Sequence, residues 1–421
     1  MKVLWICNMP LPGACKAFSI ESGVGGGWLY EEARRLISGG EIELFVCFAN
    51  RRSKKIKKAF DGEMTHYSIP RLLPNLFAYD FTMNKYFDEI IKDIKPDFVH
   101  IHGTENAVGL SAMRSHPELT YIVSLQGVLN YICMHECDGI PFWAHWSFGL
   151  ATLIMQKGAG ALHRRHIGGS KNEQKIVQGA KYVLGRTNYD YAFAQSVNIN
   201  AKYIKNNRFL RESFYSKKWN SERLKNHTIL IGNSAMPLKG VHYLFQAMPE
   251  LIKRIPDIKV RIIGTESNIC NIKDWLNISG YQLYLKRLIK HFNFKKHITF
   301  TGNLSAEELC VEMQNTSLFV LASNADNSPN MLGEAMILGV PCVASFVGGV
   351  PDMIVHRESG LLYQHDAPYM LASGIIEVLN DATFANKLSR GGKERAQEIY
   401  SPKNKEQLRN FYLWLLHEDI E

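Results

Sequence analysis

The sequence predicts an α/β protein with two doubly wound, Rossmann-like domains that face a cleft between them. Short apolar runs of strand length alternate with amphipathic helical patterns in both halves of the chain, which is typical of parallel sheets covered by helices on both faces. The chain has 421 residues, which is long for one hydrophobic core and sufficient for two. Because parallel sheets bind ligands at the carboxyl ends of their strands, we expect the ligand site in the cleft.

The first half of the chain supplies an N-terminal domain, which we place at residues 1–200. A glycine cluster at residues 23–27 precedes an expected helix at 28–38. A second helix, around residues 87–94, is stopped by Pro96. The strands expected in this half lie at residues 3–7, 42–48, 97–102, 121–125 and 182–184.

The second half repeats the alternation after a basic segment at residues 201–225, which we interpret as a linker. We expect a C-terminal domain at 226–400 and a final helix within 401–421 that packs back on the N-terminal domain through an apolar stripe. The stripe consists of Leu408, Phe411, Tyr412 and Leu415. The strands expected here lie at 228–231, 259–263, 298–300, 318–321 and 341–346, and the helices at 241–254, 281–292, 306–314 and 331–338.

Composition narrows the class of protein. A hydrophobic content of 46% is typical of globular proteins. The eight cysteines are scattered through apolar runs, which indicates free thiols in a reducing compartment. The apolar run at the N-terminus is too short for a signal peptide, and no run is long enough to span a bilayer, so we expect a cytoplasmic protein.

The net charge of +9 is unevenly distributed, with basic clusters at residues 51–58 and 201–225. Such clusters are either solvated faces or surfaces that attract nucleic acid or anionic lipid. No nucleic-acid partner is expected, because the sequence has no recognition-helix, zinc-finger or RNA-binding pattern. An anionic membrane surface stays open, since the Trp-rich segment at 140–155 fits either a core helix or a helix lying in the membrane interface. In the second case the protein is peripheral at the inner face of the plasma membrane.

The most informative segment is 323–352, where two carboxylates flank an amide-rich turn. Asp326 and Glu334 are separated by a turn that reads as a helix start, with Ser328 as N-cap and Pro329 at the first helical position. A helix N-terminus offers free N–H groups and partial positive charge, which suits a phosphate, and a carboxylate one turn later can accept hydrogen bonds from sugar hydroxyls. These features favour a sugar nucleotide, and the alternative is an ordinary βαβ unit whose acidic side chains face water.

Several motifs resemble the retaining glycosyltransferases of family 4, which have the GT-B fold. They span nearly the whole chain in the expected order, and those in the second half are the more specific. They are the glycine loop before the first long helix, His102-Gly103, Lys239-Gly240, the Asp326–Glu334 segment and Gly348-Gly349-Val350-Pro351-Asp352. The segments Gly185-Arg186-Thr187 and 238–242, together with Arg211, are similar to a subgroup from bacterial surface-polysaccharide pathways.

The resemblance implies a site for a nucleoside-diphosphate sugar, either UDP- or GDP-linked, with no metal ion and no further cofactor. It places Glu334 on the ribose hydroxyls and Asp326 against the transferred sugar. The groups that it places near the diphosphate are Lys239, the backbone N–H groups of Asn330, Met331 and Leu332, and the glycines Gly25 and Gly26. Ser234 and Gly264, which follow neighbouring strands, are included in the donor site.

The sequence departs from the family pattern in ways that affect charge. The arginine that usually stands a few residues before the lysine is absent, and Asn233 and Ser234 occupy that region. We hypothesise that Arg186 or Arg211 supplies the missing positive charge. Gln126 stands where a histidine often follows a strand of the N-terminal domain, and glutamine can hydrogen-bond a hydroxyl but cannot titrate.

Two further groups carry alternative interpretations. His102 ends an expected strand, and we take it as a candidate catalytic residue, the alternative being a histidine packed in the core. Cys133, His135 and Cys137 raise the question of a metal site. Their spacing fits no common zinc pattern and no fourth ligand is evident, so no metal is expected.

The sequence thus predicts a cytoplasmic, retaining hexosyltransferase. Its donor is a nucleotide sugar, its acceptor is a glycan that is free or lipid-linked, and its role is in surface polysaccharide synthesis. Two alternatives stay open: a catalytically silent sugar-nucleotide-binding or scaffold protein, and a GT-B sugar-nucleotide epimerase.

Overall fold

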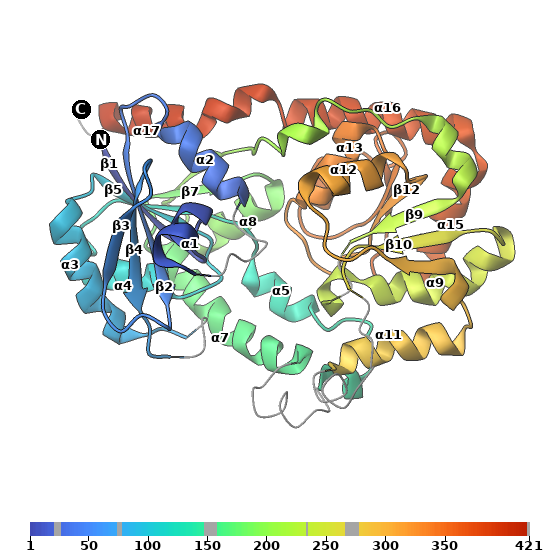
Figure 1. The fold of residues 1–421 in the computed structure, drawn as a ribbon, viewed down its shortest axis with the longest axis horizontal. Helices are drawn as coiled ribbons and strands as arrows, with labels where there is room; N and C mark the ends of the chain where they lie inside the picture. The colour runs from blue at the N-terminus through green and yellow to red at the C-terminus, as the bar shows by residue number, and fades with distance from the viewer. Residues whose placement is uncertain (21–26, 74–77, 147–157, 233–234, 266–277, 419–421) are drawn as a thin grey trace. The chain divides into compact units, whose positions relative to one another are not determined.

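The computed structural model describes residues 1–20, 27–73, 78–146, 158–232, 235–265 and 278–418. The chain forms two units, each built on its own sheet (Figure 1). Unit 1 comprises Met1–Asn130, Arg165–Phe209 and Pro402–Glu421, and unit 2 comprises Tyr131–Arg164 and Leu210–Ser401. This division differs from the expected one, because residues 131–164 group with unit 2 and the basic segment 201–225 is split between the units rather than forming a linker.

Unit 1 contains an eight-stranded sheet in the order β3-β4-β2-β1-β5-β6-β7-β8, parallel except for the β3–β4 pair. The order reverses between β1 and β5, which makes the sheet doubly wound. Its edge strand β8 comes from the segment expected to be a linker. The strands are β1 (Lys2–Cys7), β2 (Glu43–Asn50), β3 (Lys57–Phe60), β4 (Thr65–Pro70), β5 (Phe98–His102), β6 (Tyr121–Ser124), β7 (Tyr182–Gly185) and β8 (Lys202–Lys205).

Helices cover both faces of this sheet, because its central strands are apolar on both sides. Along β1, Leu4 and Ile6 join the core cluster made with α3, α4, α7 and α8, whereas Trp5 joins the cluster made with α2 and α17. Continuous burial of successive side chains is what parallel strands require. The helices are α1 (Pro12–Phe18), α2 (Gly27–Ile37), η1 (Phe81–Met83), α3 (Asn84–Ile94), α4 (Val108–Ser115), α7 (Ala159–Gln178), α8 (Asn188–Val197), η7 (Pro402–Glu406) and α17 (Gln407–Glu418), with α5 (Leu129–His135) and α7 each crossing into unit 2.

Unit 2 contains a six-stranded, fully parallel sheet in the order β11-β10-β9-β12-β13-β14. Here the order reverses between β9 and β12, so this sheet is also doubly wound. The strands are β9 (Thr228–Ile231), β10 (Lys259–Ile262), β11 (Ile298–Phe300), β12 (Leu318–Leu321), β13 (Cys342–Ser345) and β14 (Leu361–Tyr363).

The helices of unit 2 also divide between two core clusters. Ile229 and Ile231 pack with α9, α11 and α15, while Leu230 between them packs with α12, α13 and α14. The helices are η2 (Phe142–His145), η3 (Glu212–Phe214), η4 (Ser221–Asn226), η5 (Pro237–Lys239), α9 (Val241–Arg254), α11 (Gly280–His291), η6 (Lys295–His297), α12 (Ala306–Gln314), α13 (Asn330–Leu338), α14 (Val350–Met353), α15 (Pro368–Asn380) and α16 (Ala382–Ile399). The two doubly wound sheets confirm the predicted α/β fold class.

The C-terminal helix α17 inserts a tyrosine into the core of unit 1. Trp5 Nε1 on β1 donates a hydrogen bond to Tyr412 Oη at 2.8 Å, and the same hydroxyl bonds His100 Nδ1 on β5. Leu408, Phe411 and Leu415 are buried in the same cluster. The amphipathic stripe of this helix therefore packs on its own chain.

The structure corrects the expected start of one helix and describes only part of the Trp-rich segment. The helix predicted to start at Pro329 begins one residue later, with Pro329 itself as an extended N-cap (ψ 119°), and Ser328 does not cap it. Instead, Ser328 Oγ lies 3.4 Å from Tyr400 Oη. In the Trp-rich segment, Ile140 and Ala144 are buried in the core of unit 2, while residues 147–157 lie outside the described residues.

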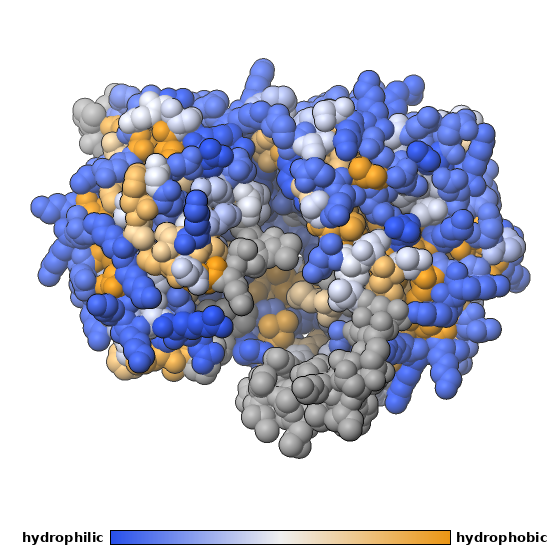
Figure 2. All heavy atoms as spheres, in the orientation of Figure 1, coloured by the Kyte–Doolittle hydropathy of each residue, from blue (hydrophilic) through white to orange (hydrophobic). Residues whose placement is uncertain are grey.

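Hydrophilic side chains dominate the face of the molecule shown in Figure 2, and hydrophobic ones are scattered in small groups. No helix among the described residues combines the length and the apolar character that crossing a bilayer requires.

Candidate functional site

The candidate site lies at the carboxyl ends of the strands of unit 2, where the strand order reverses. β9 and β12 are neighbours in the sheet although β10 and β11 separate them along the chain. Open α/β sheets bind their ligands at such a reversal, because the loops that leave the two strands diverge. The segment after β9 carries Lys239 and the loop after β12 carries Asp326, so the topology brings these two expected site residues together.

Lys239 and Asp326 form an ion pair across the reversal point. The distance from Lys239 Nζ to Asp326 Oδ2 is 2.7 Å, and Ser323 Oγ donates to the same oxygen at 3.1 Å. The lysine side chain is 33% exposed and the carboxylate side chain 15% exposed. The ammonium is therefore oriented by one oxyanion while still accessible to a second one.

Two glycines allow the backbone to close up around this pair. Gly240, with φ of 66°, has no room for a side chain, since a Cβ would lie 1.7 Å from the carbonyl oxygen of Ala322. At Gly348, with φ of 47°, a Cβ would lie 2.0 Å from the carbonyl oxygen of Asp326. The Lys239-Gly240 and Gly348-Gly349 motifs thus have a steric basis, because left-handed backbone and close approach both require glycine.

The N-terminus of α13 follows the Asp326 loop. The N–H groups of Leu332 and Gly333 both donate to the carbonyl oxygen of Pro329, at 3.1 and 3.2 Å. Within the described ranges, the backbone N–H groups of Asn330 and Met331 have no hydrogen-bond acceptor. Of the three N–H groups expected to face a diphosphate, that of Leu332 is therefore already in use, and two are left at the positive end of the helix.

Glu334, one turn into α13, is buried and paired with Arg211. Its two carboxylate oxygens accept hydrogen bonds from Arg211 Nε and Nη2, each at 2.6 Å. The carboxylate side chain is 1% exposed, whereas that of Arg211 is 38% exposed. Burial raises the pKa of Glu334, and the guanidinium opposes that rise. The arginine is therefore the group that keeps a carboxylate charged in this position.

The two arginines considered for the missing positive charge are placed differently. Arg211 belongs to unit 2 and contacts Glu334, as described above. Arg186 belongs to unit 1, where its backbone N–H donates to the Asp190 carboxylate and its Nη2 donates to the carbonyl oxygen of Gln126 at 3.3 Å. Of the two, Arg211 is the one that contacts an expected donor-site residue within unit 2.

The remaining expected donor-site residues are glycines and a serine. Gly264 follows β10 with φ of 114°, and its N–H and carbonyl groups pair with those of Gly302 at 3.0 and 3.1 Å. This bridge fixes the end of β10 and requires a residue without a side chain. Gly25, Gly26 and Ser234 lie outside the described residues, so their expected roles stay predictions.

His102 lies at the corresponding reversal point of unit 1, at the end of β5. Its ring is 2% exposed and packs on the rings of Trp5 and His100, with centroids 4.1 and 4.0 Å away. Neither ring nitrogen has a hydrogen-bond partner among the described residues. Burial, together with His100 and Arg208, holds the pKa of His102 well below its usual value. The structure therefore places a neutral imidazole at this point.

A small cavity of about 20 Å³ adjoins His102 at this edge of unit 1. It has room for about one water molecule. Arg208, stacked 3.5 Å over the ring of Trp28, lines it together with Glu32 and Arg186. Burial raises the pKa of Glu32, and the charges of Arg208, Arg35 and Arg186 oppose that rise. This edge therefore combines a neutral histidine with charged groups that stabilise one another.

Sequence reasoning missed two residues that hold the Asp326 loop. Ser323 and Asn324 are fully buried directly after β12. Ser323 orients Asp326, while the Asn324 N–H donates to the carbonyl oxygen of Leu238 at 2.8 Å and so ties this loop to the segment that carries Lys239. Their signal in the sequence is the position of polar residues immediately after a buried apolar run, where a parallel strand ends.

Comparisons with known proteins agree with this geometry. Residues 214–395 match the family model described as glycosyl transferases group 1. An uncharacterized glycosyltransferase of Methanocaldococcus jannaschii is 28% identical over 163 residues, which is 39% of this chain and 38% of that protein. The chain thus spans well under half the length of this curated relative.

Two solved structures share the whole fold. Sucrose-phosphate synthase from Thermosynechococcus elongatus superposes with a TM-score of 0.71 at 16% identity, over 99% of this chain and 100% of that one. Anabaena HepE, solved in complex with UDP and glucose, gives a TM-score of 0.64 at 14% identity, over 98% and 99%. At these identities the likeness concerns the fold alone, which is GT-B.

Proposed function

We propose that this chain, which belongs to the group 1 glycosyl transferases and has the GT-B fold, transfers a sugar from a nucleoside-diphosphate sugar to an acceptor hydroxyl. The observation that carries the proposal is the Lys239–Asp326 pair at the reversal point of unit 2, beside the N-terminus of α13. A cation, a carboxylate and free helical N–H groups gathered at one strand end are what a charged sugar donor requires.

Lys239 and the N-terminus of α13 serve the leaving group. When the bond between the anomeric carbon and the diphosphate oxygen breaks, negative charge develops on the diphosphate. The Lys239 ammonium and the N–H groups of Asn330 and Met331 stabilise that charge where it forms. The bond to Asp326 holds the Lys239 ammonium in position at this strand end.

Asp326 serves the sugar, whose anomeric carbon becomes positively charged as the bond breaks. Its carboxylate stabilises that charge. We also propose that the anomeric configuration is retained: the acceptor oxygen bonds to the anomeric carbon on the face that the diphosphate leaves, and the acceptor proton passes to the departing diphosphate oxygen. Bonds and charge balance without a metal ion or a further cofactor.

The Arg211–Glu334 pair serves the nucleoside. Each oxygen of Glu334 accepts one hydrogen bond from Arg211 and keeps a second lone pair, which can accept a ribose hydroxyl. Arg211 keeps the buried carboxylate charged and fixed in orientation.

The finer substrate assignment rests on the motifs of the sequence. We propose a hexose donor, linked to UDP or GDP, and a glycan acceptor that is free or lipid-linked, in surface polysaccharide synthesis. The glucose and UDP bound in HepE support a hexose nucleotide by analogy of fold. For a lipid-linked acceptor, the exposed Arg51, Arg52, Lys54 and Lys55 suit an anionic membrane surface.

A donor screen tests the proposed function. The purified chain is incubated with UDP- and GDP-hexoses, with and without glycan acceptors, and the released nucleoside diphosphate is measured. We expect slow release with one donor and faster release with a matching acceptor. Stabilisation by a nucleotide sugar without any release would favour the silent binding protein, and a new sugar nucleotide among the products would favour the epimerase.

Vesicles containing anionic lipid, floated at low and high salt, test the membrane surface separately.

A further inference from the structure

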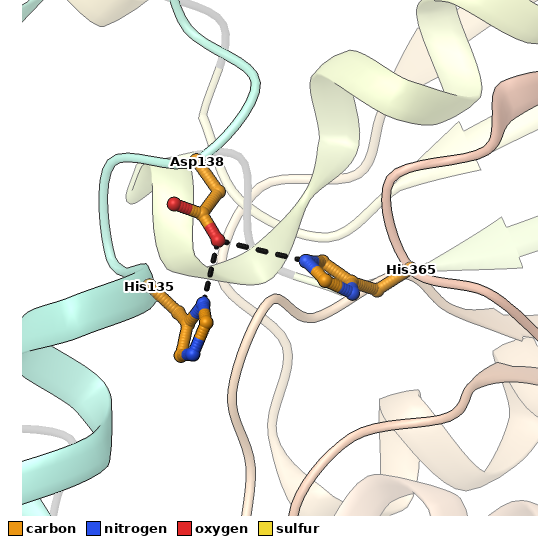
Figure 3. A group of neighbouring side chains, drawn as sticks. All are labelled: His135, Asp138 and His365. Atoms are coloured by element: carbon orange, nitrogen blue, oxygen red, sulfur yellow. Dashed lines mark hydrogen bonds and ion pairs between the residues drawn. The ribbon is translucent and has the colours of Figure 1, made fainter.

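Two histidines and an aspartate, none of them assigned to the donor site, form a cluster in unit 2 (Figure 3). His135 is the last residue of α5, Asp138 lies in the loop that follows, and His365 lies between β14 and α15. The two histidines come from opposite halves of the sequence, and both imidazoles point at the same carboxylate, as Figure 3 shows.

The geometry of the cluster centres on one oxygen. Asp138 Oδ2 is 2.7 Å from His135 Nδ1 and 3.5 Å from His365 Nε2, and the three candidate ligand atoms all lie within 4.8 Å of one another. The two imidazole rings are 6.0 Å apart and nearly perpendicular. Two imidazole nitrogens and a carboxylate oxygen that converge in this way are a common ligand set for zinc and other first-row divalent cations.

We infer that His135, Asp138 and His365 form a binding site for a divalent first-row cation of the zinc class. A tetrahedral ion holds nitrogen and oxygen ligands at about 2.0–2.1 Å, which spaces neighbouring ligand atoms by about 3.3 Å. The separation of 3.5 Å between Asp138 and His365 already fits, and the 2.7 Å contact with His135 requires only a small opening. One coordination position is left for water.

The backbone around Asp138 is held in place by residues outside the cluster. Asn324 Nδ2 donates to the carbonyl oxygens of His135 and Asp138, at 3.0 and 3.3 Å. His242 Nε2 donates to the carbonyl oxygen of Asp138 at 3.1 Å. These bonds fix the loop from two different elements, so the ligands are largely positioned before an ion arrives.

The side chains are neither sealed nor fully solvated, which an ion needs in order to reach them. Their exposed fractions are 25% for His135, 33% for Asp138 and 21% for His365. An ion here ties the α5 end of the segment 131–164 to the loop after β14. Because Asn324 and His242 also adjoin the loops of Asp326 and Lys239, a bound ion stiffens the same part of unit 2.

This inference does not depend on the proposed function, and its test measures metal binding rather than sugar transfer. The full chain without a histidine tag is treated with a chelator, dialysed, and titrated with ZnCl₂ by calorimetry. Co²⁺ serves as a spectroscopic probe, because its visible absorption reports coordination by nitrogen and oxygen. We expect one ion per chain, bound with micromolar or tighter affinity.

Variants decide which residues hold the ion. His365→Ala and Asp138→Asn should each weaken Zn²⁺ binding by at least about 10–100-fold, the size of effect seen when even outer-shell partners of a metal site are lost. Asp138→Asn keeps the size of the side chain, so it is the variant to rely on if His365→Ala folds poorly after the metal is removed by chelator. His291→Ala, an exposed histidine at the end of α11, is the matched control and should bind like the parent chain.

Two outcomes would overturn the inference. In the first, Zn²⁺ binds the parent chain weakly or not at all, so that the cluster is only a hydrogen-bonded His-Asp-His group. In the second, binding survives in both ligand variants but is lost in Cys137→Ser, which would assign the ion to the neighbouring thiol. Retained binding in Cys137→Ser together with loss in Asp138→Asn supports it.

Discussion

The two units are both doubly wound but place different chemistry at the point where the strand order reverses. In unit 2 this point holds the ion pair of Lys239 and Asp326, which solvent can reach. In unit 1 it holds His102, buried on Trp5, with a hydrogen bond of 2.5 Å from Asn8 Nδ2 to Glu105 Oε2 nearby. The fold therefore provides two similar platforms, and burial decides what each one can do.

The two reversal points differ in how easily a charged ligand can replace an existing interaction of the protein. The Lys239 side chain is partly exposed to water, so a phosphate can take over part of its pairing at a small desolvation cost. His102 has a pKa well below its usual value, because protonation would bury a charge beside His100 and Arg208. Unit 2 is thus suited to an anionic donor, whereas unit 1 buries a neutral imidazole beside the charged groups Glu32, Arg186 and Arg208.

The strongest way to break this comparison is to remove the charge from unit 2. Lys239→Ala should lower the rate of nucleoside diphosphate release by about 10²–10³, the usual loss for one group that stabilises developing negative charge. Steady-state kinetics with saturating donor measure this. Lys290→Ala, an exposed lysine on α11, should leave the rate unchanged. An unaltered rate in Lys239→Ala would mean that the diphosphate is held elsewhere.

The second test concerns the buried carboxylate of unit 2. Arg211→Ala leaves Glu334 buried without its cation, and we expect a loss of about 2–3 kcal/mol in the free energy of unfolding. Fully buried pairs lose about 3–5 kcal/mol, and the loss is smaller here because Arg211 is 38% exposed. Urea unfolding measures it. The double variant Arg211→Leu with Glu334→Leu should recover much of the lost stability, while its donor affinity stays low. An equal loss of stability in the single and the double variant would contradict this account.

A third test addresses the support behind His102 in unit 1. Tyr412→Phe removes the hydroxyl that accepts the Trp5 Nε1 hydrogen and bonds His100. A buried donor left without its partner costs about 1–3 kcal/mol. Thermal unfolding should show this loss, with Tyr369→Phe on the exposed start of α15 as the control. If both variants unfold alike, α17 contributes packing only.

The last test is the dependence of stability on pH, and it probes the buried histidines at the reversal point of unit 1. Burial lowers the pKa of His100 to about 3 from 6.5. Below pH 6.5 the unfolded chain binds a proton at this histidine that the folded chain excludes. The contribution of neutral His100 to the free energy of unfolding is therefore fully present above pH 6.5 and is lost progressively as the pH falls toward 3. Each pH unit within that window costs about 1.4 kcal/mol per such histidine.

Hydrogen exchange at β5 amides between pH 7 and pH 5 measures this loss. The variant His100→Gln should show a shallower dependence on pH than the parent chain. Parallel slopes in the two proteins would place the acid sensitivity outside unit 1.

Several elements could be predicted from local pattern, and the exceptions have different causes. The central strands of both sheets were predicted from their continuous apolar runs, because a parallel strand is buried on both faces. The edge strands β3 and β8 were missed, since their sequences KKAF and KYIK carry the charges that protect an exposed edge. Strand β4 was missed because its buried side chains include the polar His66 and Ser68.

The sequence by itself determined the two doubly wound units and the strand ends at which Lys239, Asp326 and His102 lie, because periodicity and glycine positions are local properties. Only the tertiary structure decided that Arg211 pairs with Glu334, that His102 is buried and neutral, and that His365 meets His135 and Asp138. These contacts join distant parts of the chain, and their partners, burial and pKa values are set by packing that no local pattern contains.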